Sequence, residues 1–218
     1  ISDQTQLDFD SEFTQQLGTF DRGVSTFQKK FVMNPKTFTG EPNDGDMRVK
    51  DHFYQFRLSH TFNDTWTLNS ALSYKDAQLV GFSTEPRRMQ ADGQTLERQR
   101  RYRNYQSEDL LLQTELLGKL EHSWARHELL VSSEIGQLDY RQYQQRRNHS
   151  ASNPNTINIY HPIYAQYLPS LAPFTDTDER QRYFALNLQD QIFFNDQWSV
   201  LLGSRFDQVE QNFENHRT

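Results

Sequence analysis

The sequence predicts an all-β protein: an antiparallel meander of about six or seven strands that forms part of a transmembrane up-and-down β-barrel. Three observations lead to this prediction. Apolar residues recur at every second position in paired segments, the connections alternate between short and long, and aromatic residues gather at the short connections. No run of apolar residues approaches the length of a membrane-spanning helix, so any membrane crossing has to be made by strands.

The first pair of strands is predicted from Tyr54 to Tyr74. Its first arm has apolar or aromatic side chains at almost every even position up to Phe62, and polar side chains at the odd positions. Asn63-Asp64 is a turn signal, and the run from Trp66 to Tyr74 alternates again. Together the two arms predict a hairpin with one apolar face.

Two further pairs repeat this scheme. The second runs from Asp109 to Glu121 and from Leu129 to Ile135, and the third joins Phe184–Phe194 to Trp198–Phe206 through Asn195-Asp196. These pairs bring the number of strands to six, or seven if the N-terminal segment adds one. Asp190 breaks the apolar face of its strand, so it either faces lipid at an energetic cost or is turned inward by a bulge.

The connections are unequal. Those within pairs take two to five residues, but about twenty residues (Ala77 to Arg98) and about forty (Arg141 to Arg180) separate successive pairs. Short turns at one end and long loops at the other are typical of outer-membrane barrels. A soluble up-and-down barrel or sandwich does not need this asymmetry.

Aromatic residues mark the short turns. Trp66, Trp124 and Trp198 each lie in or just after one of them, and Phe62 and Phe194 lie across two of them. Rings at one height predict an aromatic girdle at the membrane interface. Cross-strand aromatic pairs in a soluble sheet are the alternative explanation.

Composition excludes several classes. The chain has 218 residues, 34% of them apolar but 13% aromatic, which is inconsistent with simple disorder. A net charge of -6 disfavours nucleic-acid binding, and the lack of cysteine excludes thiolate metal sites. The sequence has no nucleophile elbow, phosphate loop or dinucleotide fingerprint, so we expect no enzyme.

Six short segments, in order along the chain, resemble the barrel of TonB-dependent ferric-siderophore receptors. Their spacing is similar to that of the hydroxamate-type members, the ferrichrome and ferrioxamine receptors. The segments are Phe20-Asp21-Arg22-Gly23, Phe38–Asp44, His60-Thr61-Phe62 with Trp66, Ile159–Tyr164, Leu188-Gln189-Asp190-Gln191 and Gly203–Asp207.

The resemblance implies a location in the bacterial outer membrane and a part in importing a ferric siderophore with energy from the TonB complex. Such receptors are plugged barrels of about 22 strands. Residues 1–218 are therefore expected to be one partial barrel domain without plug, signal peptide or C-terminal barrel strands. No bound cofactor is expected, because iron would enter only within the ferric siderophore. The unpaired edges of this partial sheet predict edge-to-edge self-association.

Strand parity selects the candidate ligand-binding residues. If the apolar faces look outward, six aromatic or basic side chains point into the lumen near the long loops and are expected at the mouth that receives the siderophore. They are Phe53, Arg101, Arg103, Tyr105, Tyr140 and Tyr183.

A basic cluster accompanies these residues. Arg98, Arg100, Arg101 and Arg103 lie on one strand extension, and Arg141, Arg146 and Arg147 come beside them if the hairpin continues upward. Guanidinium groups suit phosphates of lipopolysaccharide or an anionic ligand, and a solvated strand face is the alternative. Two other functions remain open: a soluble barrel or sandwich that binds a ligand or partner through its loops, and a porin-like barrel without a plug.

Overall fold

The computed structural model describes residues 3–165 and 167–217. Seven long strands form one antiparallel sheet in the order β1-β4-β5-β6-β7-β9-β10, with the short β8 paired to β6 and a separate two-stranded sheet of β2 and β3. The long strands are β1 (Thr5–Gly18), β4 (Met47–Thr61), β5 (Trp66–Met89), β6 (Thr95–Glu121), β7 (Arg126–Asn148), β9 (Ala172–Phe193) and β10 (Ser199–Asn215). The short elements are β2 (Thr26–Phe27), β3 (Lys30–Phe31), β8 (Thr156–Asn158) and the 3-10 turn η1 (Pro42–Asp44).

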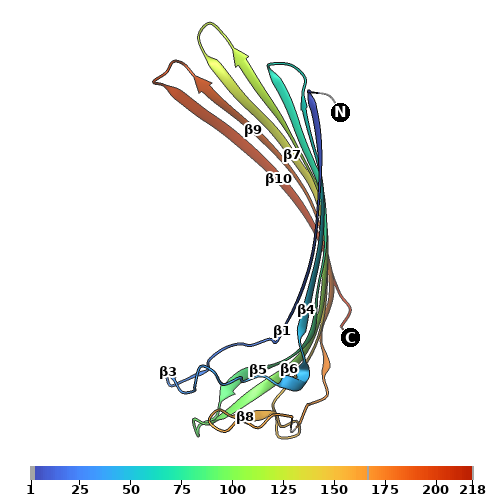
Figure 1. The fold of residues 1–218 in the computed structure, drawn as a ribbon, viewed down its shortest axis with the longest axis vertical. Coiled ribbons are helices and arrows are strands. Elements are labelled where there is room, and N and C mark those ends of the chain that lie inside the picture. Colours follow the sequence, from blue (N-terminus) through green and yellow to red (C-terminus); the bar gives the residue numbers. More distant parts are fainter. Residues whose placement is uncertain (1–2, 166, 218) are drawn as a thin grey trace.

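Figure 1 shows a single strongly curved sheet with the short turns at one end and the long connections at the other. The predicted all-β meander of six or seven strands is confirmed, and β1 is the seventh strand. None of the helices in the described part of the chain has the length and apolar character needed to cross a membrane.

The register explains why one face of the sheet is apolar. Residues aligned across neighbouring strands point to the same side of a sheet. One such row crosses six strands, and all of its side chains are apolar and exposed. It consists of Phe9, Phe56, Leu72, Leu112, Ile135 and Phe184. A continuous exposed apolar face of this kind is suited to lipid rather than water.

The apolar face has the height of a membrane. In β6 it runs from Leu120 to Leu110, which is about 33 Å along the strand and about 25 Å along the membrane normal at a tilt of roughly 40°. Four residues further along β4, β5, β6, β7 and β9, the same face carries a row of charged residues and one histidine. It consists of His52, Asp76, Glu108, Asp139 and Arg180. The strands therefore leave the lipid region before they reach the long connections.

The turn chemistry read from the sequence closes the hairpins. The Asn63 side-chain oxygen accepts hydrogen bonds from the backbone of Thr65 and Trp66, and Asn195 does the same for Gln197 and Trp198. Such Asx turns mimic a backbone turn. They fix the connections at the short-turn end of the sheet (Figure 1).

The predicted long loops are shorter than expected. Residues 77–98 are not a loop, because β5 and β6 continue as paired strands to a tight turn at residues 90–94. The forty-residue connection shrinks to residues 149–171 for the same reason. Hydrophobic alternation ends where the strands leave the lipid, but the backbone ladder requires no apolar face and goes on.

A small hydrophobic core lies at the long-connection end. It consists of Met33, Leu96, Ile157 and Ile159, which come from the 19–46 connection, β6, β8 and the 149–171 connection. At Gly81 a Cβ atom would lie 2.9 Å from the Cα of Met47, so only glycine permits this approach of β5 to β4. Beyond it the β5–β6 hairpin turns toward the hollow side of the sheet (Figure 1).

Asp190 is not turned inward. The pairing of β9 is regular around it, with Leu129 and Leu202 as its neighbours, so its side chain stays on the apolar face. One carboxylate oxygen lies 2.9 Å from Nδ1 of His127, whose ring is on the adjacent strand. A polar partner on the same face, rather than a bulge, accommodates this carboxylate.

Candidate ligand-binding site

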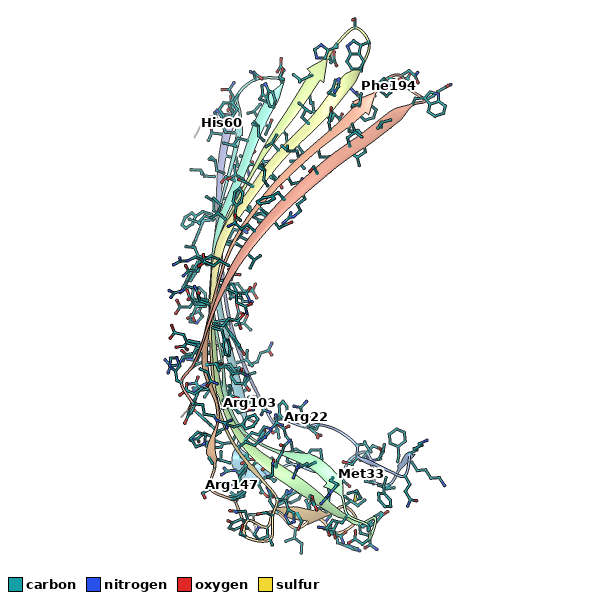
Figure 2. The ribbon with its side chains drawn as sticks, turned by 180° about the vertical axis from the view of Figure 1, so that it is seen from behind. Arg22, Met33, His60, Arg103, Arg147 and Phe194 are labelled. Atoms are coloured by element: carbon teal, nitrogen blue, oxygen red, sulfur yellow. The ribbon has the colours of Figure 1, made fainter. Side chains whose placement is uncertain are left out.

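The structure places all six candidate residues on the face opposite the apolar one. Arg101, Arg103 and Tyr105 occupy odd positions of β6 and therefore share one face. Tyr140 of β7 lies on the same face, because it is directly opposite Ser107, another odd position of β6. Figure 2 shows Arg103 and Arg22 on the hollow side of the bend. Phe53, opposite Lys75, and Tyr183, opposite Gly136, lie on the same face but nearer the short-turn end of the strands.

Arg103 and Glu85 form a buried ion pair at the centre of this face, at the long-connection end. Arg103 donates to Oε1 of Glu85 over 2.5 Å and to the Ser83 hydroxyl over 2.6 Å. The Ser83 hydroxyl donates to the same carboxylate over 2.8 Å. Charge-assisted bonds of this kind are among the strongest in proteins. The residues meet because Ser83 and Glu85 alternate along β5 on the face that Arg101 and Arg103 share in β6. Ser83 is directly opposite Arg101, and Glu85 and Arg103 lie one same-face position to either side of that pair, opposite Gln99 and Gly81.

Glu85 is shared by three arginines. Its second oxygen lies 3.3 Å from Nε of Arg22, which comes from the 19–46 connection, and 3.9 Å from Nε of Arg101. Burial raises the pKa of the Glu85 carboxyl, but the hydrogen bond and charge of Arg103, the Ser83 hydroxyl and the charge of Arg101 together bring it below its usual value. Glu85 is therefore the anion of a cluster with excess positive charge.

Aromatic rings line the same region. Phe20 lies beneath two guanidinium groups, 4.8 Å from that of Arg22 and 5.2 Å from that of Arg103. Tyr105 and Tyr140 meet edge to face with centroids 6.4 Å apart. Burial raises the pKa of the Tyr140 hydroxyl, so it remains a neutral donor at neutral pH. Rings and arginines together can hold a compact polar ligand.

Even-numbered arginines of β6 point to the other side and hold the 19–46 connection. Arg98 donates to the Gly40 carbonyl over 2.6 Å and lies 3.6 Å from the buried carboxylate of Glu41. Arg100 donates to Asp44 over 2.7 Å. The predicted basic cluster thus divides by parity into a structural half and a lumen half, and the register confirms that Arg141, Arg146 and Arg147 run beside β6.

Sequence reasoning missed the partners of the predicted residues. It did not select Glu85, Ser83, Phe20, Arg22 or Glu41 as functional or structural partners. The alternation of Ser83 and Glu85 was a usable signal, because it continues the odd face of β5 past Tyr74. Phe20, Arg22 and Glu41 gave no periodic signal, since they lie in an irregular connection.

The predicted girdle residues meet at the short-turn end. Trp124 and Trp198 are exposed, and the rings of Trp124 and Phe194 lie 6.3 Å apart. Phe62 and Trp66 face each other across the first short turn through a backbone hydrogen bond of 3.0 Å. Within the described ranges, no cluster of three or more His, Asp or Glu side chains is arranged to hold a metal ion.

Comparison with known proteins identifies relatives over the whole chain. A family model described as "TonB dependent receptor-like, beta-barrel" matches residues 1–218. The Metal-pseudopaline receptor CntO of Pseudomonas aeruginosa is 35% identical over 217 residues, which cover 97% of this chain and 30% of that protein. The chain thus spans about a third of the length of the curated relatives that it matches.

Solved structures show the same fold. The siderophore receptor PiuA from Acinetobacter baumannii superposes with a TM-score of 0.84 at 16% identity, over 98% of this chain and 34% of that chain. The ferric-catecholate import receptor Fiu from E. coli K12 gives 0.83 at 15% identity, over 97% and 35%. The chain belongs to the TonB-dependent receptor family, and the described strands are part of its outer-membrane β-barrel.

Proposed function

We propose that this chain forms one side of the barrel and ligand mouth of a receptor that imports a ferric siderophore or a similar metal chelate with energy from the TonB complex. The family match over residues 1–218 carries this proposal. The lumen face supports it, because arginine and tyrosine side chains gather where the strands rise above the apolar belt. The TonB complex would act through parts of the receptor outside these strands.

Two ligand classes are candidates. The resemblance of six short segments favours a ferric hydroxamate of the ferrichrome or ferrioxamine type. The relative at 35% identity is named a metal-pseudopaline receptor, and this favours metal-pseudopaline as the second candidate. In either case the metal arrives within its chelate, so the protein needs no resident metal.

The candidate contact residues differ in their expected roles. Tyr105 and Tyr140 offer rings and hydroxyl groups to a ligand, and Arg101 offers a guanidinium. Arg103 is committed to Glu85 and Ser83, so we propose that it positions Arg101 and Phe20. Phe53 and Tyr183 lie nearer the short-turn end and would contact the ligand only after it has passed the mouth.

Uptake by whole cells tests the proposed function. Cells with and without the complete gene are given ⁵⁵Fe-ferrichrome, ⁵⁵Fe-ferrioxamine or metal-loaded pseudopaline, each with and without functional TonB. Saturable uptake that requires both the gene and TonB is expected for at least one chelate. Diffusive, TonB-independent entry would instead identify a porin-like barrel, and absence from the outer membrane would favour a soluble binding domain.

We propose that Phe62, Trp66, Trp124, Phe194 and Trp198 anchor the short-turn end at the membrane interface. Their common height and the exposure of Trp124 and Trp198 support this role. The charged row above the apolar belt would meet the head groups of the outer leaflet, with Arg180 as a candidate partner for lipopolysaccharide phosphate. Depth-dependent quenching of tryptophan fluorescence by brominated lipids tests the girdle.

A further inference from the structure

Two arginines lie directly opposite each other on the lumen face. Arg101 of β6 and Arg146 of β7 are partners in the register, so their side chains leave the sheet side by side. Arg87, the extra residue where the β5–β6 register shifts, contributes a third positive charge that acts on Arg146. Like charges directly opposite in a sheet are destabilising.

The nearby carboxylate does not neutralise this group. Glu85 is already bound by Arg103 at 2.5 Å and Arg22 at 3.3 Å, and it is 3.9 Å from Arg101. Nε of Arg101 is buried and has no hydrogen-bond partner in the described part of the chain. Within that same part, no carboxylate lies within 4.0 Å of Arg146 or Arg87.

The neighbouring arginine pair provides an internal comparison. Arg100 and Arg147 are also direct partners, one residue away on the same two strands and on the opposite face. Arg100 donates to Asp44 over 2.7 Å, and Arg147 donates to the Ser170 carbonyl over 2.9 Å. Arg100 and Arg147 thus each have a hydrogen-bond acceptor at 2.7 to 2.9 Å, whereas Nε of Arg101 on the lumen face has none in the described part of the chain.

A ring holds one of the unpaired guanidinium groups in place. The register between β7 and β9 shifts at Gln144 and Gln145, which leaves Phe174 as the extra residue of β9. The Arg146 guanidinium carbon lies 3.4 Å from the centroid of the Phe174 ring. Stacking on the ring leaves the edge of the guanidinium free to donate in its plane. Burial lowers the pKa of both Arg101 and Arg146, and neighbouring positive charges lower it further, although the charge of Glu85 acts in the opposite direction on Arg101.

We propose that Arg101 and Arg146 form an oxyanion subsite that binds a carboxylate group of the imported metal chelate. Two adjacent guanidinium edges match the planar, bidentate geometry of a carboxylate. Phosphate of the outer leaflet is a poorer candidate, because the register places the pair on the face opposite the lipid-facing belt. This inference rests on the proposed function and specifies the chemical class of its ligand as an anionic chelate.

The first test measures anion binding apart from transport. The complete receptor is purified in detergent as wild type, as the R101Q/R146Q variant and as the R147Q control, which removes a charge one residue away on the opposite face. Melting temperature is followed against iron-free citrate at constant ionic strength. With citrate, we expect wild type and R147Q to gain stability and R101Q/R146Q to gain none.

The second test measures chelate recognition. Binding of ⁵⁵Fe-ferric citrate, a carboxylate chelate, is compared with binding of ⁵⁵Fe-ferrichrome, which carries no carboxylate in its iron shell. Each lost guanidinium should weaken ferric citrate binding about tenfold. Ferrichrome binding should weaken less than ferric citrate binding, and R101K/R146K should recover part of the loss of ferric citrate binding because it keeps the charges.

The two tests separate the two possible failures. Equal stabilisation of wild type and R101Q/R146Q by citrate would overturn the oxyanion subsite and leave the receptor function standing. If no chelate is taken up in the whole-cell assay, the proposed receptor function fails, and citrate-dependent melting still decides whether the arginine pair binds carboxylates.

Discussion

Single residues at the long-connection end depend on partners from distant parts of the chain. Glu85 is almost fully buried, yet three arginines lie within 4.0 Å of it. Removing one member of such a buried ionic cluster leaves charge without compensation, whereas breaking an exposed pair costs little. Stability at this end of the sheet should therefore follow the charge of Glu85.

We predict that acid weakens this region through Glu85. The pKa of Glu85 is lower in the folded protein than its usual value, so its stabilising contribution is complete above the unfolded pKa and is lost as the pH falls through the folded pKa. At neutral pH, E85Q should destabilise the region by about 3 kcal/mol and flatten its response to acid. Amide hydrogen exchange in residues 82–98 between pH 7 and pH 3 measures this. Parallel pH profiles for wild type and E85Q would contradict the prediction.

We predict strong coupling between His127 and Asp190 on the apolar face. H127L should destabilise the barrel by about 1 to 2 kcal/mol, because the Asp190 carboxylate would face lipid without a partner. The double variant H127L/D190L should regain most of this loss, since both side chains become apolar. Urea unfolding of the complete receptor in liposomes supplies the double-mutant cycle, and additive effects would show that the two side chains act independently.

At the scale of elements, the irregular connections are held to the strands by buried polar contacts. Glu41 is 2% exposed and also accepts hydrogen bonds from the backbone N–H of Ala165, so a single carboxylate joins the 19–46 connection, β6 and the 149–171 connection. The small hydrophobic core around Leu96 lies beside these contacts. The connections should therefore behave as one packed body.

We predict that R98M releases the 19–46 connection. The change leaves Glu41 buried without a cation and removes the hydrogen bond to the Gly40 carbonyl. Trypsin should then cut at Lys29, Lys30 or Lys36 at least tenfold faster than in wild type. E41Q/R98M is the matched control, because it removes both charges, and it should be cut more slowly than R98M. Equal cleavage of wild type and R98M would show that the hydrophobic core alone holds the connection.

In the described part of the chain, the sheet has two long edges, at β1 and β10, and no further strand pairs with their outer sides. Every other long strand is paired on both sides. Lipid offers no hydrogen bonds to such edges, so further strands must cover them in a membrane. The length of the relatives is consistent with this, since the chain spans only about a third of them.

We predict that residues 1–218 expressed alone associate edge to edge. The free edges of β1 and β10 can pair with other copies, and their exposed aromatic residues Phe13 and Phe206 strengthen the contact. Sedimentation in detergent should show dimers and larger species. A proline in place of Val209 should reduce association through β10. A monodisperse monomer at micromolar concentration would contradict the prediction.

Local patterns in the sequence were enough to predict the hairpins, the Asn-Asp turns and the face of the six candidate ligand-binding residues, because a period of two and an Asx turn are encoded within a few residues. Phe53, Arg101 and Tyr140 were thus assigned to the correct face without a structure. Three features became visible only in the folded chain. Residues 77–98 remain paired, Asp190 contacts His127, and Arg22, Arg101 and Arg103 surround Glu85. These features depend on register and on contacts between residues far apart in the chain, and no local pattern encodes them.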